Sequence, residues 1–305
     1  MDYRNLKLPP EELSRASDRI SFLYVERARI EQTNYGVKII EGDRQTDVPV
    51  TNFLCLMLGP GTSITHRAVA NVAAAGCSIV WCGENGFTFY AFGRPLTDSA
   101  KNTLKQMRLH ENKGAHIAVI RKMYKIRYPD LHAKSKPVDV LRGEEGRRVK
   151  ALYEELSRKH QIEWDGRKYD TGDFDSQDAI NKSLTYANQI LYAVVKAVIN
   201  ALGFCPSIGF IHTGHMDSFV YDIADLYKEN FSIPIAFECA KDGDFNRELI
   251  RRRMHDYIAE KDWIGVIVKD IENMFDIDCQ TQDNSNALKL WDTKSFVDSS
   301  VNYGK

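Results

Sequence analysis

The chain has 305 residues, 43% of them hydrophobic, which is enough for two domains with cores of their own. Its 41 lysines and arginines nearly balance its 42 aspartates and glutamates, which excludes a surface that is basic throughout but not a local basic patch. No apolar run is long and unbroken enough to span a bilayer, and the charged first residues do not form a signal peptide. The six cysteines form no C-x-x-C pair and fit reduced, buried thiols, so we expect a cytoplasmic protein.

Residues 19 to about 93 carry the period-two alternation and the turn signals of β-structure. An Asn-Gly pair at 85–86 stands between two β-rich runs, which is a strong signal for a hairpin. One helix is expected within this region, with Thr65 as its N-cap and Gly76 at its end. We therefore predict a β domain over residues 1–95.

Beyond the β region the apolar residues recur at helical spacing. The helix expected over 178–203 is apolar on most faces, which predicts a position at the centre of its domain. Another helix is predicted over 143–160. We predict an α-helical catalytic domain over 96–278 and a polar C-terminal tail over 279–305, so the fold class is α+β with the β part first.

Positive charge is concentrated in the first part of the helical region. Residues 121–168 hold 14 lysines and arginines against 8 aspartates and glutamates. A basic flank of this kind fits the phosphate backbone of a nucleic acid. A solvated helix face explains the same composition, so the charge alone assigns no function.

The segment GFIHTGHMDSFVYDIADLY, residues 209–227, places histidines and aspartates among apolar residues. Asp222 and Asp225 are three residues apart, which on a helix puts both carboxylates on one face, ~5–6 Å apart at Cβ. Two carboxylates this close repel each other unless a cation or a proton lies between them. His212 can join them only if the chain folds back, and a turn at residues 213–214 permits this.

The other polar residues of this segment have simpler explanations. His215 is expected as an exposed loop residue. Asp217 or Ser218 can cap a helix that begins there, which is a simple explanation for Asp217. His212 alone would be explained as a structural histidine, but its combination with two carboxylates indicates a metal site. Without a cysteine, this set suits Mn²⁺ or Mg²⁺ better than a closed zinc site. Such a site can hold a phosphate oxygen and stabilise an in-line displacement.

A further acidic element lies upstream, where Glu144 and Glu145 stand between Gly143 and Gly146. Acidic residues at the start of a helix are explained by the helix dipole alone. The arginines around this pair suggest a second role, because arginine binds phosphate and glycine allows a close approach of the backbone.

Together these pieces resemble the CRISPR-associated integrase family, the metal-dependent endonuclease subunit that inserts new spacers into CRISPR arrays, and most closely its subtype I-E branch. The likeness covers most of the chain, from about residue 18 to residue 275. The segments that carry it are residues 59–93, 142–153, 178–214 and 218–228. The glutamate motif, the His-Thr-Gly turn and the Tyr-Asp-x-x-Asp pattern make the combination specific.

The resemblance implies an N-terminal β-sandwich-like domain and a larger all-α domain, paired as a homodimer. It implies that Glu145, His212 and Asp225 hold one Mg²⁺ or Mn²⁺ ion, with Asp222 alongside them in the catalytic site. The implied activity joins the 3′-OH ends of short double-stranded prespacer DNA to CRISPR leader-repeat DNA by transesterification, and the implied partner is a small dimeric Cas protein. The residues that match positions expected on DNA are Arg142, Lys150, Tyr192, Tyr221, Lys228, Arg247 and Arg251.

Three positions depart from the pattern of the family. His215 stands where relatives carry a basic residue, and Thr88 stands where they carry an arginine in the hairpin. Arg27 stands where they carry an aromatic residue that stacks on the DNA fork. The expected metal ligands are present, so these departures concern how the duplex is measured and how its end is opened.

Two other functions fit the same residues. The first is a metal-dependent phosphoesterase of small substrates that uses His212, His215 and Asp217 as one cluster. It predicts that His215 and Asp217 are essential. The second is a non-catalytic DNA-binding scaffold, which predicts that DNA binding is unchanged in EDTA and that Glu145→Ala alters only stability.

Overall fold

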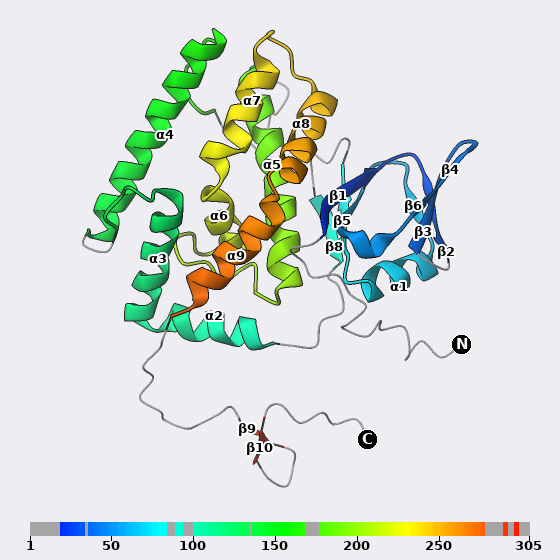
Figure 1. Cartoon of the computed structure of the whole chain (residues 1–305), viewed down its shortest axis with the longest axis horizontal. Helices are drawn as coiled ribbons and strands as arrows, with labels where there is room; N and C mark the ends of the chain where they lie inside the picture. The colour runs from blue at the N-terminus through cyan, green and yellow to red at the C-terminus, as the bar shows by residue number, and fades with distance from the viewer. Residues whose placement is uncertain are drawn as a thin grey trace.

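The computed structural model describes residues 19–33, 36–83, 89–93, 100–133, 136–168 and 177–277, together with two short strands in the C-terminal segment. As predicted, a β domain is followed by a larger helical domain (Figure 1). The expected turn at 85–86, Thr88, the junction after Gly93 and most of the tail lie outside the described residues. Strands β9 and β10 of that tail form an antiparallel pair.

The β domain contains two four-stranded sheets, with the strand orders β1-β5-β7-β8 and β4-β3-β2-β6. In the first sheet β1, β5 and β7 are parallel and β8 is antiparallel. In the second, β2, β3 and β4 form an antiparallel meander. The strands are Ile20–Val25 (β1), Arg29–Thr33 (β2), Gly36–Glu41 (β3), Arg44–Val48 (β4), Phe53–Leu58 (β5), Ser63–Ile64 (β6), Ser78–Cys82 (β7), Phe89–Gly93 (β8), Lys289–Trp291 (β9) and Phe296–Asp298 (β10).

The helix predicted within the β domain is α1, His66–Ala74. The Thr65 hydroxyl accepts the backbone N–H of Ala68 at 3.3 Å, so the predicted N-cap is confirmed. The helix ends before Gly76, whose φ of +70° lies in the left-handed region. Glycine adopts this conformation more readily than any other residue. Helix α1 packs against β2, β3 and β7 and covers the core between the two sheets.

Strand β5 belongs to both cores of the molecule. Leu56 and Leu58 pack into the core between the sheets, whereas Cys55 and Met57 pack into the core of the helical domain. Because alternate residues of a strand point to opposite faces, a strand covered on both sides is apolar at every position, as β5 is. The two domains therefore share a continuous apolar contact.

The helical domain is built around α5, Ala179–Ala201, most of whose residues are buried, as the sequence predicts. Helices α6 to α9 and the strands β5 and β7 pack around it. The surrounding elements are α2 (Lys101–Glu111), α3 (Lys113–Arg127), α4 (Val138–His160), α6 (Ser218–Asp225), α7 (Ser232–Ala240), α8 (Arg247–Glu260), α9 (Trp263–Phe275) and the 3₁₀ turns η4 (Val50–Asn52) and η6 (Lys228–Asn230).

The start predicted for α4 is wrong. The helix begins at Val138, directly after Pro137, which is extended and lacks an N–H group, so it suits the residue before a helix and not the helix interior. Glu145 therefore lies about two turns into the helix, too far for the dipole at its N-terminus to explain it. A Cβ atom at Gly143 or Gly146 would meet no atom within 4 Å, so close packing inside the protein does not require these glycines.

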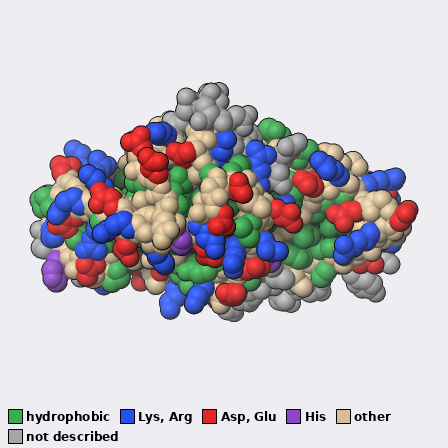
Figure 2. Space-filling view, turned by 90° about the horizontal axis from the view of Figure 1, so that it is seen from above, with side chains coloured by type: hydrophobic (Ala, Val, Ile, Leu, Met, Phe, Trp, Pro, Cys, Tyr) green, Lys and Arg blue, Asp and Glu red, His purple; other side chains and the backbone are tan. Residues whose placement is uncertain are grey.

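Acidic and basic side chains alternate over the face shown in Figure 2, with no continuous basic surface. This agrees with the nearly balanced charge of the whole chain. No helix among the described residues is both long enough and apolar enough to cross a membrane.

Candidate active site

The end of α5 and the loop between α5 and α6 are held in place by side chains of α2. Gln106 is fully buried, and its amide nitrogen donates to the carbonyl oxygens of Cys205 (3.0 Å) and Ile208 (2.7 Å). Its amide oxygen accepts the N–H of Cys205 at 2.8 Å. Asn102 donates to the Leu202 carbonyl at 2.6 Å. The path of the chain towards His212 is thus fixed by hydrogen bonds from side chains of α2 to the backbone of the loop.

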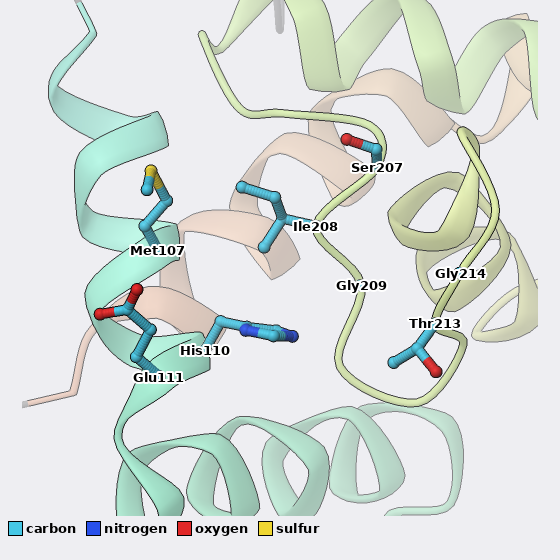
Figure 3. Close-up of a pocket in the computed structure, with 8 residues that line it drawn as sticks. All are labelled: Met107, His110, Glu111, Ser207, Ile208, Gly209, Thr213 and Gly214. Carbon is cyan, nitrogen blue, oxygen red and sulfur yellow. The ribbon is translucent and has the colours of Figure 1, made fainter.

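An open cavity of about 320 Å³ lies between the end of α2 and this loop (Figure 3). Met107, His110 and Glu111 form its α2 side, and residues 207–209 and 213–214 form the opposite side. It shares no lining residue with the pocket that holds the predicted catalytic residues.

A small pocket brings together the four residues predicted from the sequence. Glu145 comes from α4, His212 from the loop, and Asp222 and Asp225 from α6. The predicted fold-back is confirmed, because Gly214 has a φ of +84° and the His212 ring returns to α6. The other residues that line this pocket are Met123, Tyr124, Arg127, Ile211 and Leu226.

Asp222 orients the loop from within the core. Its carboxylate is almost fully buried and accepts the backbone N–H groups of Phe210, Ile211 (3.1 Å) and His212 (2.8 Å). The same carboxylate lies 2.8 Å from His212 Nδ1. Since both of its oxygens are engaged in this way, Asp222 is placed to position the loop and the imidazole.

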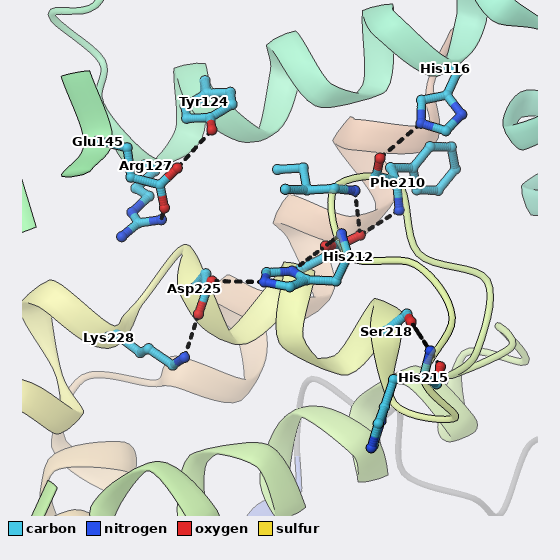
Figure 4. A network of polar contacts seen from close by, with 12 residues as sticks. His116, Tyr124, Arg127, Glu145, Phe210, His212, His215, Ser218, Asp225 and Lys228 are labelled. Atoms are coloured by element: carbon cyan, nitrogen blue, oxygen red, sulfur yellow. Dashed lines mark hydrogen bonds and ion pairs between the residues drawn. The ribbon is translucent and has the colours of Figure 1, made fainter. Parts of the chain in front are cut away.

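The His212 ring presents its second nitrogen to the pocket. With Nδ1 bonded to Asp222, Nε2 faces Asp225 Oδ2 at 3.8 Å (Figure 4). The hydrogen bond to Asp222 raises the pKa of His212, against the opposing effect of partial burial, and Asp225 raises it further. A histidine whose Nδ1–H donates to a carboxylate is the arrangement usual for a metal ligand, because the neutral ring then offers the lone pair of Nε2.

Glu145 is engaged through both of its oxygens. The Tyr124 hydroxyl donates to Oε2 at 2.7 Å, and the Arg127 guanidinium forms an ion pair with Oε1. Burial raises the pKa of Tyr124, and so does its bond to Glu145, so this hydroxyl keeps its proton. The sequence interpretation missed Tyr124 and Arg127, although MYKIRY places them three residues apart, on one face of a helix.

Asp225 is paired with Lys228 at 2.5 Å, one turn further along the chain. The Lys228 ammonium also lies 5.0 Å from the ring centre of Tyr192. Burial alone would lower the pKa of Lys228, but the charge of Asp225 raises it overall, so the side chain stays positive. Lys228 is therefore the charged partner of one pocket carboxylate, although it does not itself line the pocket.

The remaining residues predicted to contact DNA fall into separate groups. Tyr192 and Tyr221 are in edge contact, with 5.1 Å between ring centres, and Tyr221 also contacts the His212 ring. Arg142 and Lys150 are exposed on α4. In α8, Arg247 lies over the Phe245 ring at 5.4 Å, and Arg251 lies over the ring of Tyr24, in β1, at 4.4 Å.

His215 and Asp217 do not line the pocket. His215 is exposed, as predicted, and its backbone N–H and carbonyl bond to the Ser218 hydroxyl. The predicted capping role of the Asp217 side chain is wrong, because its carboxylate forms an ion pair with Lys196 of α5 at 2.7 Å and makes no capping bond.

The pocket residues have the donor chemistry for a divalent ion but are not arranged as a complete ligand set. Within the described ranges, no three histidine, cysteine or acidic side chains stand together as a complete ligand set, since Glu145 faces Tyr124 and Arg127. The chemistry of the donors nevertheless fits a hard cation. Glu145 and Asp225 supply carboxylate oxygens, and His212 supplies an Nε2 atom that Asp222 leaves unused.

Fold and pocket define a two-domain α+β protein with a carboxylate and histidine site in its helical domain. Residues 125–272, which include Glu145, His212, Asp222 and Asp225, match the family described as CRISPR associated protein Cas1. The CRISPR-associated endonuclease Cas1 of Clostridium sp. (strain SY8519) is 36% identical over 96% of this chain and 97% of its own length. The CRISPR-associated endonuclease Cas1 2 of Chlorobaculum tepidum is 38% identical over 88% of this chain and 92% of its own length.

A solved structure shows the same fold. The crystal structure described as a TtCas1-DNA complex is 37% identical in sequence, with a TM-score of 0.68 over 85% of this chain and 98% of that one. The chain therefore belongs to the CRISPR-associated protein Cas1 family, as the sequence motifs predict.

Proposed function

We propose that this chain is a divalent-metal-dependent DNA endonuclease and integrase. It joins the 3′-OH ends of short prespacer DNA to CRISPR leader-repeat DNA by transesterification, in the manner of the subtype I-E branch. The observation that carries the proposal is the Asp222–His212 pair, which aims Nε2 at the pocket shared by Glu145 and Asp225. Relatives named CRISPR-associated endonucleases and a related structure described as a DNA complex support it.

In this proposal Glu145, His212 and Asp225 hold one Mg²⁺ or Mn²⁺ ion. When bound, the ion acts as a Lewis acid on the scissile phosphate and neutralises its developing charge. Asp222 keeps the proton on Nδ1 of His212 and fixes the direction of the ring. Tyr124 holds one oxygen of Glu145 and so limits the rotation of its carboxylate.

The exposed side of α4 is the surface that we assign to the DNA backbone. Arg142 and Lys150 are exposed there on either side of Glu145, and Gly143 and Gly146 leave the helix surface bare beside it. A phosphate backbone can approach such a surface closely, because no side chain stands in its way.

As in the family, we expect a homodimer that assembles with a small dimeric Cas partner.

The proposal is tested by strand transfer. Wild type, His212→Ala and His215→Ala are each mixed with the small Cas partner, a short duplex with 3′-OH ends, and a supercoiled plasmid that carries a CRISPR leader and repeat, in Mn²⁺ or in EDTA. Wild type and His215→Ala are expected to join the DNA in Mn²⁺, whereas His212→Ala and the EDTA samples do not. Joining by His212→Ala at the rate of wild type would refute the proposal.

The two other functions have less support in the geometry. A phosphoesterase built on His212, His215 and Asp217 would need all three side chains in one pocket, but His215 is exposed and Asp217 is paired with Lys196. A non-catalytic scaffold would have no use for the polar contacts that orient His212. Loss of activity in His215→Ala would favour the first, and DNA binding without joining would favour the second.

A further inference from the structure

Arg127 is a charged residue of the pocket that the proposed ligand set leaves without a role. It stands in the last turn of α3, lines the pocket, and has a side chain that is only 8% exposed. Burying a guanidinium is unfavourable unless it is paired and hydrogen-bonded. Its partners therefore indicate what it does in the site.

The guanidinium is held from behind by Glu229. Nε donates to Glu229 Oε1 at 2.9 Å, and Nη2 lies 2.6 Å from the same oxygen. The Tyr128 hydroxyl donates to Glu229 as well, and the Tyr128 ring lies 5.2 Å from the guanidinium carbon. This anchor does not involve Glu145, so Arg127 keeps its place if the Glu145 carboxylate turns to another partner.

Arg127 has donors beyond those that its partners use. An arginine side chain carries five N–H bonds. Among the described residues, Glu229 accepts the Nε–H, Glu145 accepts one N–H of Nη1, and Nη2 is in ion-pair contact with Glu229. At least one N–H of Nη1 and one of Nη2 remain, and Nη1 is the nitrogen paired with the pocket carboxylate of Glu145. Paired N–H donors of this kind match the non-bridging oxygens of a phosphodiester.

We propose that Arg127 is a further catalytic residue of strand transfer, which donates hydrogen bonds to a non-bridging oxygen of the scissile phosphate while Glu229 holds it in place. The inference rests on the proposed function. In the reaction the attacking 3′-oxygen bonds to phosphorus, and the bond from phosphorus to the leaving 3′-oxygen breaks. The attacking hydroxyl releases one proton and the leaving oxygen takes one up. Arg127 stays protonated throughout and stabilises the charge on the phosphate.

The contrasting explanation is that Arg127 only neutralises and positions Glu145. Arg127→Lys separates the two, because lysine keeps the charge next to Glu145 but lacks the forked donors. Arg148→Lys is the matched control. Arg148 lies over the same Tyr128 ring at 4.7 Å and pairs with Asp130, but it does not line the pocket.

The first test measures strand transfer and the increase in melting temperature that Mn²⁺ produces. Arg127→Lys is expected to lower kcat about 100-fold with little change in KM, while the increase in melting temperature is kept. Arg148→Lys is expected to stay within about twofold of wild type. A rate for Arg127→Lys within threefold of wild type would overturn the inference while the proposed function stands. Loss of the Mn²⁺ effect together with activity would also overturn it, in favour of a positioning role.

A second test needs no variant and so does not depend on folding. Each non-bridging oxygen of the scissile phosphate is replaced in turn by sulfur. Sulfur in place of the oxygen that binds the ion is expected to slow joining in Mg²⁺. The softer Mn²⁺ should restore the rate of this substrate. The oxygen bound by Arg127 should give a slowing that Mn²⁺ does not rescue. If Mn²⁺ rescues both substitutions, or neither slows the reaction, Arg127 makes no such contact.

Discussion

At the scale of single residues, the site is organised by one buried carboxylate. Asp222 binds three consecutive backbone N–H groups and the His212 ring, so a single side chain sets both the loop and the imidazole. Asp225, three residues on, faces the opposite nitrogen of the same ring. The sequence predicts that Asp222 and Asp225 lie on one face of a helix. Only the structure shows that Asp222 orients the His212 ring, whereas Asp225 faces the nitrogen that remains available.

The first prediction concerns the titration of His212 without metal. Its pKa is raised in the folded protein, chiefly by Asp222. The stabilisation from this pair is therefore complete below the unfolded value of about 6.5 and is lost as the pH rises through the folded pKa. Asp222→Asn should lower the pKa of His212 towards the unfolded value, as followed by the NMR shift of the ring proton.

Asp217→Asn is the control for this titration, because Asp217 pairs with Lys196 and does not contact His212. Its His212 midpoint should equal that of wild type. An unchanged midpoint in Asp222→Asn would mean that Asp222 does not hold the ring.

The raised pKa of His212 also affects activity, because a protonated imidazole cannot bind a metal. As the pH is lowered, we expect metal-dependent activity to be lost at a higher pH than the ordinary pKa of a histidine would give.

Residues such as Arg127 and Glu229 show why the site was predicted only in part. They are 102 positions apart and meet because α3 and the turn after α6 pack side by side. Short motifs identify residues that act within one segment, such as His212 and Asp225. A pair joined by the tertiary fold leaves no local pattern in a single sequence.

At the scale of elements, the packing of α2 against the loop is the feature that the sequence did not reveal. Periodicity predicts that α2 is helical, but it does not indicate that Gln106 faces the backbone of residues 205–208. The predicted start of α4 at Gly143 was also wrong. The helix begins directly after Pro137, and this proline is a stronger signal for a helix start than the glycines are. The cap at Thr65 was predicted correctly. The cap at Asp217 was not, because its carboxylate pairs with Lys196 of another helix.

Gln106→Leu tests this packing. It would leave the Cys205 N–H and the Ile208 carbonyl without the partner that Gln106 supplies, whereas the Cys205 carbonyl keeps the N–H of Ile208. We expect a loss of about 2–4 kcal/mol in the free energy of unfolding. Denaturant titration measures the change. Gln45→Leu, on the exposed strand β4, makes the same substitution and should change stability by less than about 0.5 kcal/mol. Equal effects of the two would show that the Gln106 contacts add nothing to stability.

At the scale of the whole molecule, the two domains are joined by β5 and by contacts of α8 with β1. Arg251 takes part in this junction through its position over the Tyr24 ring. The order of the domains and the central place of α5 could be predicted, because apolar periodicity changes sharply between the two halves. The sharing of β5 between two cores could not, since it depends on how the finished domains pack.

Salt dependence of DNA affinity distinguishes residues of the surface from residues of the junction. Lys150 is exposed on α4, so Lys150→Ala should reduce the slope of log affinity against log salt by about one unit. The family resemblance places Arg251 on the DNA, whereas its contact with Tyr24 places it at the domain junction. If the junction is its role, Arg251→Ala should leave the slope unchanged and lower the stability of the protein. A reduced slope in Arg251→Ala would place this residue on the DNA.

The most direct test of the account is the binding of Mn²⁺ itself, measured by isothermal titration calorimetry on wild type, His212→Ala and His215→Ala. We expect one ion for each wild-type chain, the same in His215→Ala, and none in His212→Ala over the same concentration range. That result would make the ring held by Asp222 a metal ligand. Equal binding by wild type and His212→Ala would contradict the account, because the ion would then lie elsewhere than in the pocket of Glu145 and Asp225.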